Sequence, residues 1–213
     1  MSTQKFKSTT SIQHFDIIIR DIDVLIQTKQ DFIGFIIIAL GIEFLGSFYD
    51  SKKFDDFGES ENRFKIAIKK LFKNKWYKNH SDWLFRHFRG PLIHQYRPSD
   101  QVYLTSTCKN KVPISEHLKK KDGKIILVIE KLYEDYKEAV ISFINLSKKN
   151  NPLDKSKLNQ EYTGIYTYLN PNIFFQFNDI QPQNFDVSGT TVSDKINNPS
   201  VLLQTSTKSK KKG

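Results

Sequence analysis

The sequence predicts a mainly α-helical protein, a bundle of four or five helices with a minor β-hairpin and a disordered C-terminal tail. Three stretches carry this prediction, namely residues 12–29, 31–50 and 123–149. In the first and the third, apolar residues recur at steps of three and four, which is the spacing of one helix face. The second is apolar nearly all round, which is typical of a central helix.

The first half of the chain contains four predicted helices. Residues 12–29 place five apolar side chains on one face, namely Ile12, Phe15, Ile19, Ile22 and Ile26. After the central helix and a loop, a third helix begins at Glu59 or Ser60. Its apolar side carries Phe64, Ala67, Ile68 and Leu71, and its opposite side carries Lys65, Lys69, Lys70 and Lys73. The pattern is interrupted at residues 74–82, and a fourth helix follows from about 80 to 89 with Trp83, Leu84 and Phe88 pointing inward.

The second half is less regular after Pro98. Val102 and Leu104 alternate weakly with polar residues, and Lys109-Asn110 can form the turn of a small hairpin. Residues 123–149 form a long helix, although their first five apolar residues fit a strand as well. Pro152 ends this helix because proline cannot continue it.

Three regions follow from this pattern. Residues 1–150 form the helical bundle domain, and residues 151–177 form an aromatic arm that packs on it. Residues 178–213 are rich in Gln, Asn, Ser, Thr and Pro and end in lysines, a composition that is typical of a disordered tail. The aromatic stretch 160–177 is also a candidate contact for a protein partner.

The composition indicates a cytoplasmic protein that needs no metal and no cofactor. The N-terminus has no apolar segment of the kind that directs secretion. Asp31 and Glu43 limit the uncharged run between them to well below the roughly 20 residues that cross a membrane. The single cysteine, Cys108, excludes a disulfide within the chain and a cysteine-based zinc site.

The net charge of +10 favours an anionic partner such as RNA, but four of the lysines lie in the last six residues. Arginine is more selective, because the chain has only five and three of them lie between residues 86 and 97. A planar guanidinium binds phosphate or carboxylate with two hydrogen bonds, which lysine cannot do. The alternative interpretation is a chance cluster with a structural ion pair.

Within this segment, Arg89 and His94 form the pattern Arg, four residues, His. The pattern resembles the R-x4-6-H motif of the HEPN (higher eukaryotes and prokaryotes nucleotide-binding) superfamily, which comprises small helical domains that include metal-independent ribonucleases. The segment "FRGPLIHQYRP" is also similar to a segment of the type "RNGLVHEYFP" in uncharacterised small bacterial proteins.

The resemblance implies a catalytic pair and a homodimer. His94 would transfer a proton as the ribose 2′-hydroxyl attacks the adjacent phosphate, and Arg89 would stabilise the developing charge. Imidazole titrates near neutral pH and guanidinium matches phosphate oxygens, so the chemistry is sound. The two protomers would bring their motifs together across the dimer interface.

The geometry requires a bend between the two side chains. Residues five apart on a straight α-helix differ in direction by roughly 140°. Gly90-Pro91 predicts the bend, because proline lacks an N–H and disfavours the helical conformation in the residue before it. We therefore expect the fourth helix to break at Gly90 and resume at Pro91.

Further residues are expected to support this site. Arg86, Arg97 and Tyr96 are candidates for phosphate or nucleotide binding. Glu43 lies on an otherwise apolar helix, so we expect Arg89 or Arg86 to be its partner. His87 is in phase with Trp83, which indicates a stacking or core-edge residue rather than a base.

Three functional hypotheses result. The first is a HEPN-like endoribonuclease, and the second is a non-catalytic helical module that binds a protein or a nucleotide. The third is nucleic-acid binding by the basic tail, with an affinity that depends steeply on salt.

Overall fold

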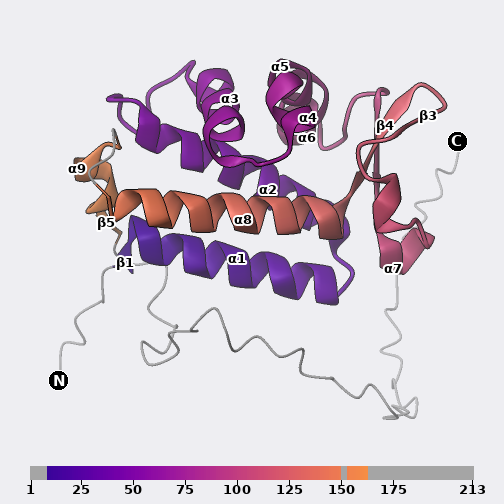
Figure 1. Cartoon of the computed structure of the whole chain (residues 1–213), viewed down its shortest axis with the longest axis horizontal. Helices are drawn as coiled ribbons and strands as arrows, with labels where there is room; N and C mark the ends of the chain where they lie inside the picture. The colour runs from indigo at the N-terminus through magenta and orange to yellow at the C-terminus, as the bar shows by residue number, and fades with distance from the viewer. Residues whose placement is uncertain (1–8, 150–152, 163–213) are drawn as a thin grey trace, which may run out of the picture. The chain divides into compact units, whose positions relative to one another are not determined.

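The computed structural model describes residues 9–149 and 153–162 and confirms a mainly helical fold with a small β-sheet (Figure 1). Three long helices run side by side, and a fourth packs across two of them. These four are α1 (Ser11–Gln27), α2 (Asp31–Gly46), α8 (Ile129–Ser147) and α3 (Ser60–Leu71). Helix α2 contacts the other three, so it lies at the centre of the bundle as predicted.

Helix α1 begins at a reciprocal cap formed by Thr10 and Gln13. The Gln13 backbone N–H donates to the Thr10 hydroxyl, and the Thr10 N–H donates to the Gln13 side-chain oxygen at 2.9 Å. Phe15, Ile19 and Ile22 are buried on one face, in agreement with the predicted spacing.

Small residues allow other segments to approach α2 closely. A Cβ atom at Gly41 would overlap the hydroxyl of Tyr136 on α8, and one at Gly46 would overlap the backbone carbonyl of Arg63 on α3.

Among the described residues, α2 together with the 3-10 turn η1 (Ser47–Tyr49) forms one helical segment that is apolar and long enough to cross a membrane. More than half of it is buried, as in the core helix of a soluble protein.

Helix α3 buries the predicted face of Phe64, Ala67, Ile68 and Leu71. The segment after it was predicted to be irregular, but it contains a short helix, α4 (Lys75–Asn79), which the Asn74 side chain caps by accepting from the Trp76 N–H at 2.9 Å. The helical pattern could not be recognised there because one turn is too short to show a period.

The sheet differs from the prediction in its turn. Strand β2 (Val102–Thr105) pairs in parallel with β4 (Lys124–Val128), and β3 (Lys120–Lys121) pairs antiparallel with β4. The hairpin turn is therefore Asp122-Gly123, both with positive φ, and the predicted turn at Lys109-Asn110 is wrong. Those two residues belong to the helical turn α7 (Thr107–Asn110), which is followed by the 3-10 turn η3 (Ile114–Glu116).

The beginning of the predicted arm packs on the bundle. Leu153 and Leu158, the latter on α9 (Lys155–Leu158), belong to the core cluster. Strand β5 (Glu161–Tyr162) pairs antiparallel with β1 (Thr9–Thr10). The rest of the predicted arm, residues 163–177, and the predicted tail, residues 178–213, lie outside the described residues.

Candidate functional site

The predicted catalytic segment lies on one continuous helix. It consists of α5 (Ser81–Leu84), the π-helical turn η2 (Phe85–Arg89) and α6 (Gly90–Gln95). Gly90 has helical angles, with φ −58° and ψ −58°, so the predicted break at Gly90 is wrong.

The π turn and a neighbouring loop explain why Pro91 does not break the helix. The Gly90 N–H donates to the carbonyl of Phe85, five residues back, which widens the turn. Pro91 has no N–H for the carbonyl of His87, four residues before it. The Ser99 N–H donates to this carbonyl instead, at 3.0 Å. The helix therefore continues without leaving that group unpaired.

Arg89 is a buried ion-pair partner of Glu43. Its side chain is only 7% exposed, and one terminal nitrogen forms a salt bridge with the Glu43 carboxylate. The guanidinium carbon also lies 5.5 Å from the centre of the Phe85 ring, a cation–π geometry. Of the two partners expected for Glu43, Arg89 is therefore the one with which it pairs. The ion pair connects the π-helical turn η2 to α2.

The structure does not bring Arg89 and His94 together. Arg89 faces the core, whereas His94 is exposed five residues later on the same helix. Arg86, Arg97 and Tyr96 are exposed as well, Tyr96 by 75%. Tyr96 ends the helix in a left-handed conformation, with φ 53°. Within one chain, these residues form no shared phosphate site.

His87, on η2, belongs to a different group of side chains, an aromatic cluster that extends from α4 through α5 to η2. Its ring lies 5.1 Å from that of Trp83, and its Nδ1 lies 3.1 Å from the Ser99 hydroxyl. Trp83 in turn packs edge-on against Trp76, with 6.0 Å between ring centres. Trp76 stacks on His80 at 4.3 Å with only 16° between the ring planes.

Hydrogen bonds fix two of these rings. The His80 Nδ1–H donates to the Trp76 carbonyl at 2.7 Å, since a carbonyl can only accept. The Trp83 Nε1–H donates to the Gln101 side chain at 3.1 Å. The tautomer of His80 and the orientation of Trp83 are therefore set before any ligand binds.

The cluster borders a small pocket of about 150 Å³, which we call the aromatic pocket. Its walls come from the α4–α5 region, from the loop before β2 and from the β3–β4 hairpin. They consist of Trp76, His80, Trp83, Gln101, Lys120, Gly123 and Ile125. Exposed Lys121 and Lys124 lie on the same hairpin as Lys120. Planar rings and exposed positive charges thus meet at one surface.

A hydrogen-bonded chain lies between α4, η3 and α8. The Val128 N–H donates to His117 Nδ1 at 2.9 Å, which places the ring proton on Nε2. Nε2–H then donates to the Tyr77 oxygen at 2.6 Å, and the Tyr77 hydroxyl donates to Asp135 at 2.9 Å. Lys131 pairs with the other oxygen of Asp135 at 3.0 Å.

Burial controls the protonation of this chain. Burial, assisted by the positive charge of Lys131, lowers the pKa of His117 to about 4. Burial, assisted by the negative charge of Asp135, raises the pKa of Tyr77 well above its ordinary value. His117 is therefore neutral and Tyr77 protonated near neutral pH, and each polar atom of the chain is paired.

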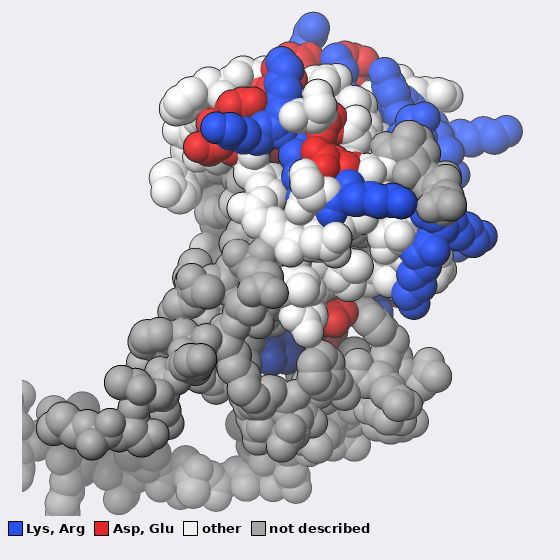
Figure 2. Space-filling model, turned by 90° about the vertical axis from the view of Figure 1, so that its left-hand side faces the viewer, with Lys and Arg blue, Asp and Glu red and all other residues white. Residues whose placement is uncertain are grey.

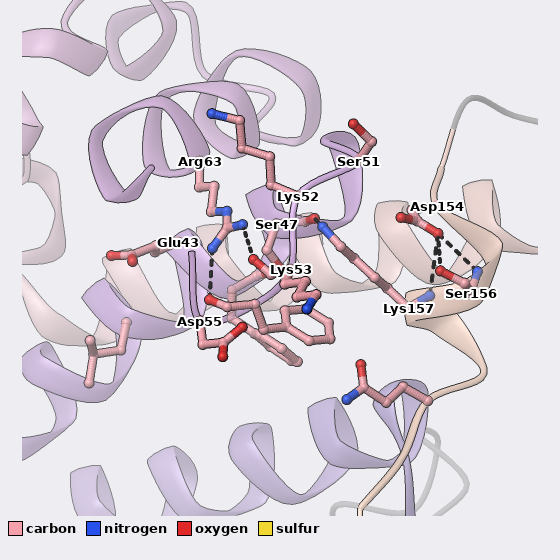
Figure 3. Close-up of a pocket in the computed structure, with 14 residues that line it drawn as sticks. Glu43, Ser47, Ser51, Lys52, Lys53, Asp55, Arg63, Asp154, Ser156 and Lys157 are labelled. Atoms are coloured by element: carbon pink, nitrogen blue, oxygen red, sulfur yellow. Dashed lines mark hydrogen bonds between the residues drawn. The ribbon is translucent and has the colours of Figure 1, made fainter. Parts of the chain in front are cut away.

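A cavity of about 660 Å³ lies at the C-terminal end of α2 (Figure 3). Arg63 lines it and donates to the carbonyls of Phe54 and Lys53 and, through Nε at 2.7 Å, to Asp50. Lys157 reaches in from α9, and its three N–H groups donate to the Ser47 carbonyl, the Asp50 carbonyl and the Asp50 carboxylate.

These contacts hold the two cations in structural roles. Burial opposes ionisation of Asp50, but the hydrogen bonds from Arg63 and Lys157 outweigh it, so the pKa of Asp50 lies below its usual value. No local pattern of residues predicts this cluster. Arg63 is separated from the other arginines, and Lys157 is one lysine among many.

Within residues 9–149 and 153–162, no group of three or more His, Cys, Asp or Glu side chains is arranged to hold a metal ion. Comparison of the sequence with protein families and curated proteins, and of the structure with solved structures, found no match.

Proposed function

We propose that this protein is a non-catalytic helical module that binds single-stranded RNA at the aromatic pocket. One observation carries the proposal, namely that stacked Trp76 and His80, Trp83 and Lys120 line the same pocket. Bases stack on exposed aromatic rings while lysines neutralise the backbone phosphates, and this is how sequence-tolerant single-strand sites are built. The net charge of +10 favours the encounter.

The geometry supports binding better than cleavage. An acid–base pair would have to reach one phosphate, but Arg89 is engaged with Glu43 inside the fold and His94 is exposed on another side of the helix. The histidines of the aromatic cluster, His80 and His87, make their contacts with Trp76, Trp83 and Ser99, so these contacts hold the rings within the cluster.

The test is binding of a fluorescently labelled ten-nucleotide single-stranded RNA, followed by anisotropy. Trp83→Ala should weaken binding about 5- to 150-fold, because stacking contributes about 1–3 kcal/mol per base. Trp83→Phe should retain most of the affinity. The matched control is Phe57→Ala, because Phe57 is fully exposed on a loop away from the pocket.

The salt dependence gives an independent readout. Lys120→Gln should reduce the slope of log affinity against log salt by about 0.7, the value for one phosphate contact on a single strand. Lys73→Gln is the control, since Lys73 is exposed two residues after the end of α3 and pairs with Glu138. Equal affinities for Trp83→Ala and Phe57→Ala would refute the aromatic pocket as the site, and binding lost only on deleting residues 205–213 would assign it to the tail.

A further inference from the structure

The aromatic pocket has the size of one six-membered ring. Its volume is about 150 Å³, and a protein cavity of about 150 Å³ accommodates one benzene molecule. Trp76 and Trp83 supply flat aromatic surface, and Ile125 supplies aliphatic surface. Uracil and cytosine consist of one six-membered ring, whereas adenine and guanine have a second ring fused to it. The pocket therefore suits a pyrimidine base better than a purine base.

The backbone of Gln101 is held at the pocket wall by two hydrogen bonds. Its N–H donates to the Ser99 hydroxyl at 3.3 Å. Its carbonyl accepts from the N–H of Ile125 on β4 at 2.8 Å. Because Ile125 lines the same pocket, Gln101 and the sheet form one connected wall.

Trp83 determines which end of the Gln101 amide is available. The indole N–H is only a donor, so the Gln101 atom that lies 3.1 Å from it is the amide oxygen. Within residues 9–149 and 153–162, no hydrogen bond engages the amide nitrogen of Gln101, and the residue is exposed. The pocket therefore presents an oriented N–H donor to a ligand.

An N–H donor at this place matches the carbonyl oxygen at position 2 of a pyrimidine. Uracil and cytosine both carry this oxygen, and adenine carries no carbonyl group. Proteins recognise the bases of single-stranded RNA by stacking on their faces and by hydrogen bonds to their edges. The tryptophan rings provide the first kind of contact, and Gln101 provides the second. Exposed Lys120 lines the same pocket and supplies a cation for the phosphate of the bound nucleotide.

The cavity of about 660 Å³ at the C-terminal end of α2 is larger but less suited to a nucleotide. Three of its lining residues, Glu43, Asp55 and Asp154, are acidic and repel phosphate. Figure 2 looks onto that end of the molecule and shows both basic and acidic side chains on it. None of the described residues that line the aromatic pocket is acidic. Charge therefore favours the aromatic pocket over the larger cavity.

We infer that the aromatic pocket holds one pyrimidine of an RNA strand, with its ring against the tryptophans and its O2 accepting a hydrogen bond from the Gln101 amide nitrogen. The inference rests on the proposed function, because it names the base that enters the same pocket. Since the pocket accommodates one ring, the preference concerns one nucleotide of the strand.

Fluorescence anisotropy with labelled ten-nucleotide strands of oligo(U), oligo(C) and oligo(A) tests the preference. Oligo(U) and oligo(C) should bind about threefold or more tightly than oligo(A). Gln101→Leu keeps the size of the side chain and removes its N–H donor. It should weaken binding of oligo(U) and oligo(C) about 3- to 10-fold, the contribution of one hydrogen bond, and leave oligo(A) unchanged. Gln95→Leu is the matched control, because Gln95 is exposed on α6 and does not line the pocket.

Two further variants separate the hydrogen bond from the size of the pocket. Gln101→Glu keeps an oxygen for the Trp83 N–H but has no amide nitrogen. Its negative charge weakens every strand, so the readout is the ratio of oligo(U) to oligo(A) affinity, which should fall about threefold or more. Ile125→Ala enlarges the pocket and should raise oligo(A) affinity relative to oligo(U), with thermal unfolding as the check on its fold. Self-stacking of oligo(A) is the same for each variant and cancels in these comparisons.

The outcomes distinguish this inference from the proposed function. Equal affinities of the wild type for oligo(U) and oligo(A), with Trp83→Ala still weakening both, would overturn the pyrimidine preference and leave RNA binding at the pocket intact. An equal loss for all strands in Gln101→Leu would likewise overturn the role of Gln101. If Trp83→Ala and Phe57→Ala bind every strand alike, the proposed function fails, and the pyrimidine site fails with it.

Discussion

The neutral state of His117 predicts a loss of stability on mild acidification. His117 has a pKa of about 4 in the folded chain and 6.5 as its ordinary value. As the pH falls from 6.5 toward 4, the unfolded chain takes up a proton that the folded chain does not accept. Because the unfolded state binds more protons in this window, the free energy of unfolding decreases as the pH decreases.

The magnitude follows from the same two values. Between pH 7 and pH 5, this difference in proton binding lowers the free energy of unfolding by about 2 kcal/mol. The value is RT times the logarithm of the ratio of the unfolded-state to the folded-state titration polynomial, compared at the two pH values. His117 is partly exposed, which reduces the expected effect to about 1–2 kcal/mol. Below pH 4 this contribution levels off because the folded state is then protonated as well.

The assay is urea unfolding at pH 7, 6 and 5, followed by circular dichroism. His117→Gln removes the titrating group and keeps a side-chain oxygen that can accept from the Val128 N–H. The variant should be less stable than the wild type at pH 7, and its unfolding free energy should fall by about 1–2 kcal/mol less between pH 7 and pH 5. His14, whose pKa burial also lowers, is present in both chains and cancels in the comparison. Parallel pH dependences of the two chains would refute the reasoning.

Three further predictions concern the fold and the predicted catalytic pair. Gly46→Ala should lower the free energy of unfolding by about 3 kcal/mol or more, measured by thermal or urea unfolding, because its Cβ would overlap the backbone carbonyl of Arg63. An unchanged free energy would mean that α2 and α3 separate easily. Arg89→Met should lower the free energy of unfolding by about 2 kcal/mol, because it leaves Glu43 without its cation. Adding Glu43→Leu should restore most of this stability. If stability does not recover, Arg89 acts through other contacts. His94→Ala should change the unfolding free energy by less than about 0.5 kcal/mol, because the side chain is exposed, and should leave RNA affinity unaltered. Chelator-resistant RNA cleavage that this last variant abolishes would instead favour the ribonuclease hypothesis.

Local chemistry explains why the predicted catalytic site was not assembled. Gly90-Pro91 is a reliable sign of a helix break only if the carbonyl that proline leaves unpaired finds no other donor. Here Ser99, which lies beyond the end of the helix, supplies that donor. Sequence spacing cannot reveal this, because the donor comes from a loop whose path depends on the rest of the fold.

The aromatic pocket could likewise be predicted only in part from the sequence. Trp76, His80 and Trp83 are visible in the sequence at helical steps of four and three. Their neighbours Gln101 and Lys120 come from segments with no local signal for this contact. Because the turn was predicted at Lys109-Asn110, the hairpin that turns at Asp122-Gly123 was missed. This hairpin places Lys120 at the pocket.

The sequence by itself determined the helical class and the buried faces of α1, α3 and α8, because a period of 3.6 residues places apolar side chains on one side of a helix wherever that helix docks. Helix α2 is apolar nearly all round, so its sequence predicted a central position but not which side is buried. Tertiary structure alone decided which polar groups meet. Arg89 on η2 pairs with Glu43 on α2, and Lys157 on α9 pairs with Asp50, which lies 107 positions earlier in the chain. Such pairs depend on the directions of side chains from distant segments, and those directions are fixed only when the core packs.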